Sequence, residues 1–333
     1  MSRIVARLRY LLWLAPVGII MLLSGCSGIS RREAQSMTKE QVQGPSGARV
    51  AAAAAPAKTE PTQTYPVKIV SDIAYYTGPD ADPVRHKLDL YLPEGLTDFP
   101  VLVFIHGGGW TMGSKNQWVP FLGAYKNLGE AFARQGIGTV LSNYRLSPKY
   151  KHPAHIEDVA RTWAWVYRNI AQYGGRPNEM FAMGQSAGGH LVALLATDPR
   201  YLQAQSLSTD TIRGVIAMSG VYKLDFGMGT NGGQPPKMIT QAFGNDPAVW
   251  ADVSPINHVH PGLPPFLVIS AGREWAFLRA QAERFAVALE NSGDRTDFLI
   301  LPDKNHFTEV GDIGSKGDVA TTEVAAFIRS HLP

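Results

Sequence analysis

The chain has 333 residues, with 31 Lys and Arg against 28 Asp and Glu, and it contains a single cysteine. Three arginines among the first 25 residues account for the whole positive excess, so the rest of the chain has no net charge. This balance gives no support to nucleic acid as a partner, and one cysteine excludes an internal disulfide.

Residues 1–25 are expected to be a signal peptide, because Arg3, Arg7 and Arg9 precede an apolar run at 10–23. The stretch Leu23-Ser24-Gly25-Cys26 resembles the lipobox of bacterial lipoproteins. The resemblance implies cleavage before Cys26, acylation of this residue, and a lipid anchor that holds the protein at the bacterial cell envelope. An ordinary secretory signal and an uncleaved anchor are the alternatives.

Residues 26–64 are expected to form a flexible, lipid-anchored linker. They contain no aromatic residue and few large aliphatic residues, so they cannot bury a core of their own. The remaining residues, 65–333, have the length of one large α/β domain, which we expect to be catalytic.

Strand-like and helix-like patterns alternate along this domain, which predicts a mainly parallel, eight-stranded sheet with helices on both faces. The strands are expected at 67–76, 87–92, 100–105, 137–141, 180–183, 215–218, 265–270 and 297–301, the first two as an antiparallel pair. Helices are expected at 121–134, 156–170, 190–196, 277–289 and 319–328. The irregular segment 219–264 is expected to supply a small cap beside an open cleft.

The stretch Gly184-Gln185-Ser186-Ala187-Gly188 lies between a predicted strand and a predicted helix. Strand, tight turn with a central serine, and helix is the arrangement of a nucleophile elbow. Ser186 would then stand at a helix N-terminus, where the dipole and free N–H groups favour negative charge. We therefore predict that Ser186 is a catalytic nucleophile.

A second motif, His106-Gly107-Gly108-Gly109-Trp110, follows the buried strand at 100–105. Such a loop supplies part of the oxyanion hole in serine hydrolases of this layout. The N–H groups of Gly107, Gly108 and Ala187 are the predicted donors.

The predicted base and acid come from two loops nearer the C-terminus. His306 follows the strand at 297–301, and Glu274 is the one carboxylate in the loop 271–275 after the strand at 265–270. A serine nucleophile needs a histidine base, and the histidine needs a carboxylate to orient it. The rival acids are Asp303, Asp297 and Glu283.

These motifs resemble the α/β-hydrolase superfamily, in its carboxylesterase branch related to hormone-sensitive lipase. Within that branch the chain is similar to feruloyl-esterase-like proteins, kynurenine formamidases and prenylcysteine methylesterases. The resemblance extends over about residues 65–333 and is carried by 106–110, 143–145, 173–175, 183–189 and 305–307. It implies the α/β-hydrolase fold and hydrolysis of esters or amides.

We therefore expect a serine carboxylesterase that acts on a small ester, with short-chain or aryl acyl groups, through an acyl-enzyme. No metal or organic cofactor is expected, because no carboxylate or cysteine completes the histidine pairs at 152/155 and 258/260. An arylformamidase or amidase with the same triad and a catalytically silent binding module are the alternatives. The residues expected to contact substrate are Trp110, Tyr222, Phe226 and Trp275.

Overall fold

The computed structural model describes residues 45, 48–50, 63–116, 125–225 and 235–333. These residues belong to one unit, Gly44–Pro333. The predicted signal peptide and Cys26 therefore lie outside the described residues, as does Phe226. Among the described helices, none combines the length and the apolar composition that a membrane span requires.

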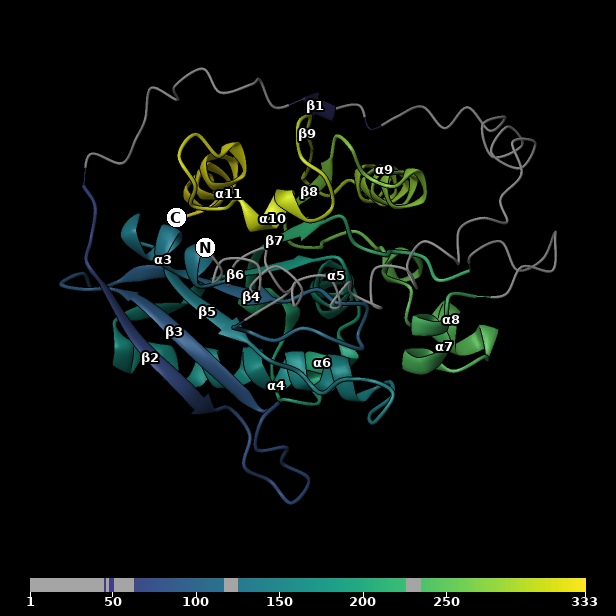
Figure 1. Ribbon diagram of the computed structural model, residues 1–333, viewed down its shortest axis with the longest axis horizontal. Helices are drawn as coiled ribbons and strands as arrows, with labels where there is room; N and C mark the ends of the chain where they lie inside the picture. Colours follow the sequence, from purple (N-terminus) through teal and green to yellow (C-terminus); the bar gives the residue numbers. More distant parts are fainter. Residues whose placement is uncertain (1–44, 46–47, 51–62, 117–124, 226–234) are drawn as a thin grey trace, which may run out of the picture. The chain divides into compact units, whose positions relative to one another are not determined.

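A nine-stranded sheet is the centre of the fold, with the strand order β1-β9-β8-β7-β6-β4-β5-β3-β2 (Figure 1). β3 runs antiparallel to both of its neighbours, and every other pair is parallel. The prediction of a mainly parallel sheet with an antiparallel leading pair is confirmed. The strands are β1 (Ala48–Val50), β2 (Val67–Ala74), β3 (Lys87–Pro93), β4 (Phe99–Ile105), β5 (Gly138–Ser142), β6 (Gly175–Gln185), β7 (Ile212–Met218), β8 (Phe266–Ala271) and β9 (Thr296–Leu301).

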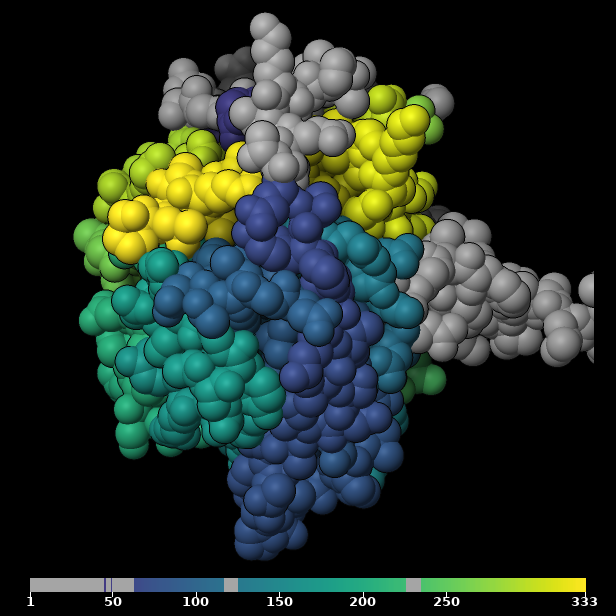
Figure 2. Space-filling model, turned by 90° about the vertical axis from the view of Figure 1, so that its left-hand side faces the viewer, coloured from purple at the N-terminus to yellow at the C-terminus, as the bar shows by residue number. Residues whose placement is uncertain are grey.

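The ninth strand, β1, lies inside the segment that we predicted to be a flexible linker. It is three residues long and pairs in parallel with β9 from Phe298 to Ile300. An edge strand offers unpaired N–H and C=O groups, and a short passing segment can pair with them. At the opposite edge, the purple and blue residues of β2 and β3 lie on the surface that Figure 2 presents.

Helices cover both faces of the sheet because the strands present apolar side chains on alternate sides. In β4, Val101, Val103 and Ile105 belong to one core cluster, together with apolar residues of α4, α5 and α9. Leu102 and Phe104 belong to the other cluster, together with residues of α3 and α11. Continuous apolar strands of this kind are typical of a parallel sheet that is buried on both faces.

The helices agree with the predicted positions, and the segment 219–264 contains additional short helices. α3 begins at Lys126, with Tyr125 as its N-cap, which is later than the predicted start at residue 121; residues 117–124 lie outside the described residues. The helices are α3 (Lys126–Arg134), α4 (Ala154–Asn169), η1 (Ile170–Tyr173), α5 (Ala187–Thr197), α6 (Arg200–Gln203), η2 (Thr209–Thr211), α7 (Lys237–Phe243), α8 (Pro247–Asp252), η3 (Pro255–His258), α9 (Ala276–Asn291), α10 (Thr308–Gly311) and α11 (Val319–Ser330).

Candidate active site

Ser186 occupies the sharp turn between β6 and α5. Its backbone has φ 56° and ψ −118°, a conformation that non-glycine residues rarely adopt. The turn is fixed from both sides, since the N–H of Ser186 donates to the carbonyl of Met218 at 2.9 Å. A Cβ at Gly188 would collide with the carbonyl oxygen of Ile105, so α5 begins directly against the end of β4. Strained, well-supported backbone of this kind is common at reactive residues.

His306 and Glu274 meet at the same edge of the sheet. The Nδ1 atom of His306 lies 2.9 Å from Oε2 of Glu274, and the Glu274 side chain has no exposed surface. The second oxygen, Oε1, accepts a hydrogen bond from the backbone N–H of Trp275 at 2.8 Å. β6, β8 and β9 are parallel, so their carboxyl ends bring the three loops to one place.

Backbone hydrogen bonds hold the Glu274 loop against the His306 loop. The N–H of Gly272 donates to the carbonyl of Leu301 at 2.6 Å, and the N–H of Arg273 donates to that of Lys304 at 2.8 Å. Arg279 of α9 donates to the carbonyls of Ala271 and Gly272 at 3.0 and 3.2 Å. The relative position of acid and histidine is therefore set by the backbone as well as by their side chains.

The three rival acids lie elsewhere. Asp303 is exposed and faces Arg273 at 3.8 Å, while Glu283 pairs with Arg279 at 3.9 Å along α9. Asp297 is the second residue of β9 and therefore lies toward the opposite edge of the sheet. Among these candidates, only Glu274 bonds to His306.

Three residues that we did not single out from the sequence connect His306 to the strand ends. Gln185, the last residue of β6, donates from Nε2 to the carbonyl oxygen of His306 at 2.7 Å. The same nitrogen donates to Oε1 of Glu309 at 3.1 Å, and Ser219 donates to Oε2 of Glu309 at 2.8 Å. Each of these residues had a sequence feature that could have drawn attention to it. Gln185 is next to the predicted nucleophile, Ser219 directly follows a predicted strand, and Glu309 comes three residues after His306.

The predicted oxyanion loop leaves β4 in a tight, glycine-dependent turn. Gly108 has φ +111°, and its carbonyl accepts hydrogen bonds from Thr111 and Met112, both at 3.1 Å. The hydroxyl of buried Tyr125 has no hydrogen-bond partner among the described residues, so Gly107 stays a predicted donor beside Gly108.

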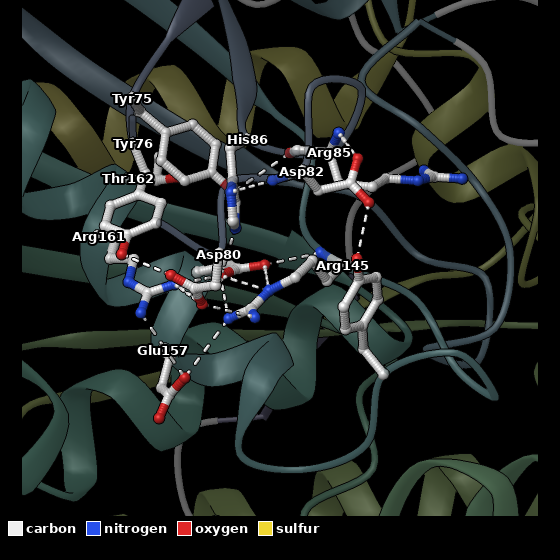
Figure 3. Close-up of polar contacts among 12 residues, drawn as sticks. Tyr75, Tyr76, Asp80, Asp82, Arg85, His86, Arg145, Glu157, Arg161 and Thr162 are labelled. Atoms are coloured by element: carbon white, nitrogen blue, oxygen red, sulfur yellow. Dashed lines mark hydrogen bonds and ion pairs between the residues drawn. The ribbon is translucent and has the colours of Figure 1, made fainter. Parts of the chain in front are cut away.

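Tyr144 and Arg145 support this loop from the end of β5. The hydroxyl of Tyr144 donates to the carbonyl of His106 at 3.1 Å, and its ring stacks on the imidazole with centroids 4.3 Å apart. Arg145 bonds the buried carboxylate of Asp158 through Nε and Nη2 at 2.9 and 2.8 Å. Figure 3 shows Arg145 within this polar network, near Asp80.

Arg85 connects this network to the residues that follow the loop: its backbone N–H donates to Asp82, which Figure 3 also labels. The Nη1 atom of Arg85 donates to the carbonyl of Gly113 at 2.8 Å. A buried ionic cluster that stabilises the backbone of a loop contributes to its rigidity, and a rigid loop is what a preorganised oxyanion hole needs.

Two of the four residues expected to contact substrate are instead packed in the interior. Trp110 is 1% exposed and donates from Nε1 to Nδ1 of His190 at 3.2 Å. Tyr222 has no exposed surface and stacks on Phe285, with ring centroids 4.3 Å apart. Their burial favours a packing role for both rings over the predicted contact with substrate.

Trp275 fits the prediction better than these two residues do. It is 40% exposed, and its ring centroid lies 4.7 Å from that of His306. Its ring is parallel to that of Phe277, which is 42% exposed. An exposed aromatic side chain beside the histidine is a suitable contact for an apolar substrate group.

His190, one turn after Ser186, has both ring nitrogens occupied. Nδ1 accepts from Trp110, and Nε2 donates to the carbonyl of Val253 at 2.8 Å. Burial lowers the pKa of this histidine to about 4. It is therefore a neutral, structural residue.

One group in the described part of the chain has the composition of a metal site. Glu274, His306 and Glu309 place one ligand atom each within 4.8 Å of one another. The Nδ1 atom of His306 already bonds Glu274, and both oxygens of Glu309 already accept hydrogen bonds. This group is therefore better described as a hydrogen-bonded network than as a metal centre.

Comparison with known proteins places the chain in a family. The model of the BD-FAE family matches residues 88–289, which is more than half of the chain and includes Ser186 and Glu274. The chain belongs to the BD-FAE family. Its similarity to curated proteins extends to Esterase LipQ of Mycobacterium tuberculosis, with 35% identity over 62% of this chain and 50% of the relative.

A second curated relative of this BD-FAE chain is matched over more of its length. Carboxylic ester hydrolase LipN of Mycobacterium tuberculosis is 30% identical over 75% of this chain and 67% of the relative. The chain spans about half the length of the first curated relatives that it matches.

Solved structures show that this BD-FAE chain has the α/β-hydrolase fold. A truncated carbohydrate esterase from gut microbiota has a TM-score of 0.65 at 20% identity, over 81% of this chain and 98% of that one. The esterase of Pyrobaculum calidifontis has a TM-score of 0.62 at 23% identity, over 80% and 86%. The fold predicted from the motifs is therefore confirmed.

Proposed function

We propose that the chain is a serine carboxylesterase that cleaves esters with short-chain or aryl acyl groups through an acyl-enzyme. The hydrogen bond between Glu274 and His306 carries this proposal, because the backbone carbonyl of this histidine is bonded by Gln185, the residue that precedes the strained turn of Ser186. The esterase names of the relatives support the same reaction.

In the proposed reaction, Ser186 attacks the acyl carbonyl while His306 accepts its proton. Glu274 holds the imidazole in one tautomer and compensates its charge once His306 is protonated. The N–H groups of Gly107, Gly108 and Ala187 stabilise the oxyanion; loss of one such donor costs about 3 kcal/mol. His306 then protonates the leaving group, and water hydrolyses the acyl-enzyme.

Substitution of the proposed nucleophile tests this function. The Ser186→Ala variant is expected to lose hydrolysis of p-nitrophenyl butyrate and labelling by a fluorophosphonate probe, with unchanged circular dichroism. Retained turnover in this variant would falsify the serine mechanism. If the wild type neither hydrolyses the ester nor reacts with the fluorophosphonate probe, the result would instead favour a binding module without catalytic activity.

An arylformamidase is the alternative with the same machinery. The exposed ring of Trp275 beside His306 is compatible with aryl esters and aryl formamides alike. Parallel kinetics with phenyl acetate and N-formylkynurenine distinguish the two, since the larger kcat/KM identifies the bond that the site cleaves better.

We also propose that Cys26 carries a lipid anchor that holds the enzyme at the bacterial cell envelope. The lipobox-like sequence before Cys26 supports this proposal. Metabolic labelling of the full chain with an alkyne-bearing fatty acid in a bacterial host tests it. The wild type is expected to be labelled and membrane-bound, whereas an equally labelled Cys26→Ala variant would refute acylation at this residue.

A further inference from the structure

A second buried carboxyl group lies beside His306. Glu309 belongs to α10, three residues after the histidine, and has no exposed surface. Its Oε1 atom lies 4.0 Å from Nδ1 of His306, the nitrogen that bonds Oε2 of Glu274 at 2.9 Å. His306 therefore has two carboxyl groups on the same side of its ring, one in contact and one just beyond hydrogen-bonding distance.

The Glu309 carboxyl group is held by the two strands that flank the serine turn. Oε1 accepts from Gln185, the residue before Ser186, at 3.1 Å. Oε2 accepts from Ser219, which directly follows β7, at 2.8 Å. Because Gln185 also donates to the carbonyl of His306, Glu309 and the backbone of the histidine share one anchor.

The charges around Glu309 favour its neutral form. Burial raises the pKa of the Glu309 carboxyl well above its ordinary value, and the charge of Glu274 adds to this effect. The hydrogen bonds from Ser219 and Gln185 act in the opposite direction but are the smaller influence. The other titratable group that faces Glu309 is buried Tyr222, whose hydroxyl is kept neutral by burial. Two carboxylates this close to each other in a buried site do not both ionise readily.

We propose that Glu309 is a positioning residue that holds the His306 loop on the strand ends as a neutral acid, with its proton on Oε2 and shared with the Ser219 hydroxyl 2.8 Å away, and that it supplies the carboxylate opposite His306 when Glu274 is removed. The inference rests on the proposed function, in which His306 is the general base. It assigns a role to a residue that neither the serine motif nor the loop after β8 identifies.

Removal of the Glu274 charge should change the state of Glu309. In a Glu274→Gln variant, one of the two effects that keep Glu309 protonated is absent. Burial, the larger effect, remains, so Glu309 ionises at a lower pH than in the wild type and gives its proton to solvent as the pH rises. A small side-chain movement of the ionised group closes the 4.0 Å gap to the Nδ1–H of His306. The imidazolium formed during catalysis is compensated by this second carboxylate.

Kinetics of two single variants and their double variant test the proposal. In a triad, replacement of the acid by its amide lowers kcat by about 10⁴-fold. Because Glu309 substitutes for it, Glu274→Gln alone is expected to lose only about 10²-fold, and the double variant about 10⁴-fold. Glu309→Gln alone should lose no more than about fivefold, since its amide oxygen still accepts from Gln185 while its NH₂ group faces the Ser219 hydroxyl.

The pH profiles give a readout that a merely structural role would not affect. Glu274→Gln should show a rise in kcat with pH as Glu309 ionises, and this rise should be absent from the double variant. A double variant whose loss equals the product of the single losses, with no difference in pH profile, overturns the proposal. Asp303 is an exposed acid on the loop that carries His306, so Asp303→Asn is the matched control. This variant should change neither kcat nor its pH profile.

Infrared difference spectroscopy tests Glu309 without any substrate. At pH 8 the wild type should show a carboxylic-acid carbonyl band that is lost in Glu309→Gln, retained in Asp303→Asn and weakened in Glu274→Gln. Identical wild-type and Glu309→Gln spectra would show that Glu309 is ionised and overturn the inference. If the wild type neither cleaves esters nor reacts with a fluorophosphonate, the proposed function fails, while the infrared band still decides the state of Glu309.

Discussion

The side-chain amide of Gln185 donates a 2.7 Å hydrogen bond to the backbone carbonyl of His306. These residues are 121 positions apart, and the bond joins the histidine loop to the residue that precedes Ser186. The distance between the proposed nucleophile and its base is thus influenced by a side chain that takes no part in proton transfer. Positioning of this kind affects the rate strongly, since small displacements of reacting groups are costly.

Substitution of Gln185 should therefore lower the rate more than the affinity. Gln185→Ala removes the bonds to His306 and Glu309, so we expect kcat to fall about tenfold or more with little change in KM. The lost buried hydrogen bonds should also reduce the free energy of unfolding by about 1–3 kcal/mol. Steady-state kinetics and urea denaturation measure the two effects. Gln172→Ala, on the exposed surface of η1, is the control and should match the wild type.

Buried neutral histidines predict a loss of stability in mild acid. Burial lowers the pKa of His190 to about 4 and that of His155 to about 3, from an ordinary value of 6.5. Between pH 6.5 and 4 the unfolded chain binds protons that the folded chain does not, so the free energy of unfolding should decrease as the pH falls. Each such group contributes up to about 1.4 kcal/mol per pH unit.

Histidine variants assign this pH dependence. His190→Gln should flatten the decline of unfolding free energy between pH 6.5 and 4, although its value at pH 7 is lower because the Trp110 contact is lost. His260→Gln, in an exposed loop, should leave the slope unchanged. Urea denaturation at a series of pH values measures the slopes, and equal slopes in wild type and His190→Gln would contradict this assignment.

The sequence was sufficient for features that depend on local pattern. The apolar run before Ser186 and the glycines around it predict the turn, because strand, turn and helix are encoded by adjacent residues. Glu274 could be selected over Asp303 because it is the one carboxylate in the loop after β8, whereas Asp303 lies on the loop of the histidine itself. To place these residues together, the predictions needed only the rule that the carboxyl ends of parallel strands lie at the same edge of a sheet.

Features that depend on which strands are neighbours could not be predicted in this way. Glu309, Gln185 and Ser219 are ordinary polar residues, and their contacts arise only once β6, β7 and β9 have been arranged in the sheet. The burial of single aromatic residues could not be predicted from the sequence either. Trp110 and Trp275 both follow glycine-rich or loop sequence, but only Trp275 is exposed in the structure. β1 was not predicted because a strand of three residues is too short to show an alternating hydrophobic pattern.

The two tryptophans should respond to substitution in different ways. Trp275→Ala removes an exposed ring beside His306, so KM for an aryl ester should rise about three- to tenfold with little change in melting temperature. Trp110→Phe removes a buried hydrogen bond to His190, so the melting temperature should fall while the ratio of aryl to alkyl kcat/KM stays constant. Kinetics with phenyl and ethyl acetate, with thermal melts, separate these outcomes. An unchanged aryl-to-alkyl ratio in Trp275→Ala would remove this residue from the substrate site.

The buried ion pair of Arg145 and Asp158 should contribute much more to stability than a surface pair does. Arg145 donates to Asp158 through three groups, its backbone N–H, Nε and Nη2, and the Asp158 side chain has no exposed surface. Lysine cannot reproduce this planar fork, so Arg145→Lys leaves a buried carboxylate poorly paired and should cost about 3 kcal/mol of unfolding free energy. Arg134→Lys, in an exposed pair with Glu130, should cost less than about 1 kcal/mol. Urea denaturation of both variants makes the comparison, and equal costs would show that the network in Figure 3 does not stabilise the fold beyond an ordinary surface pair.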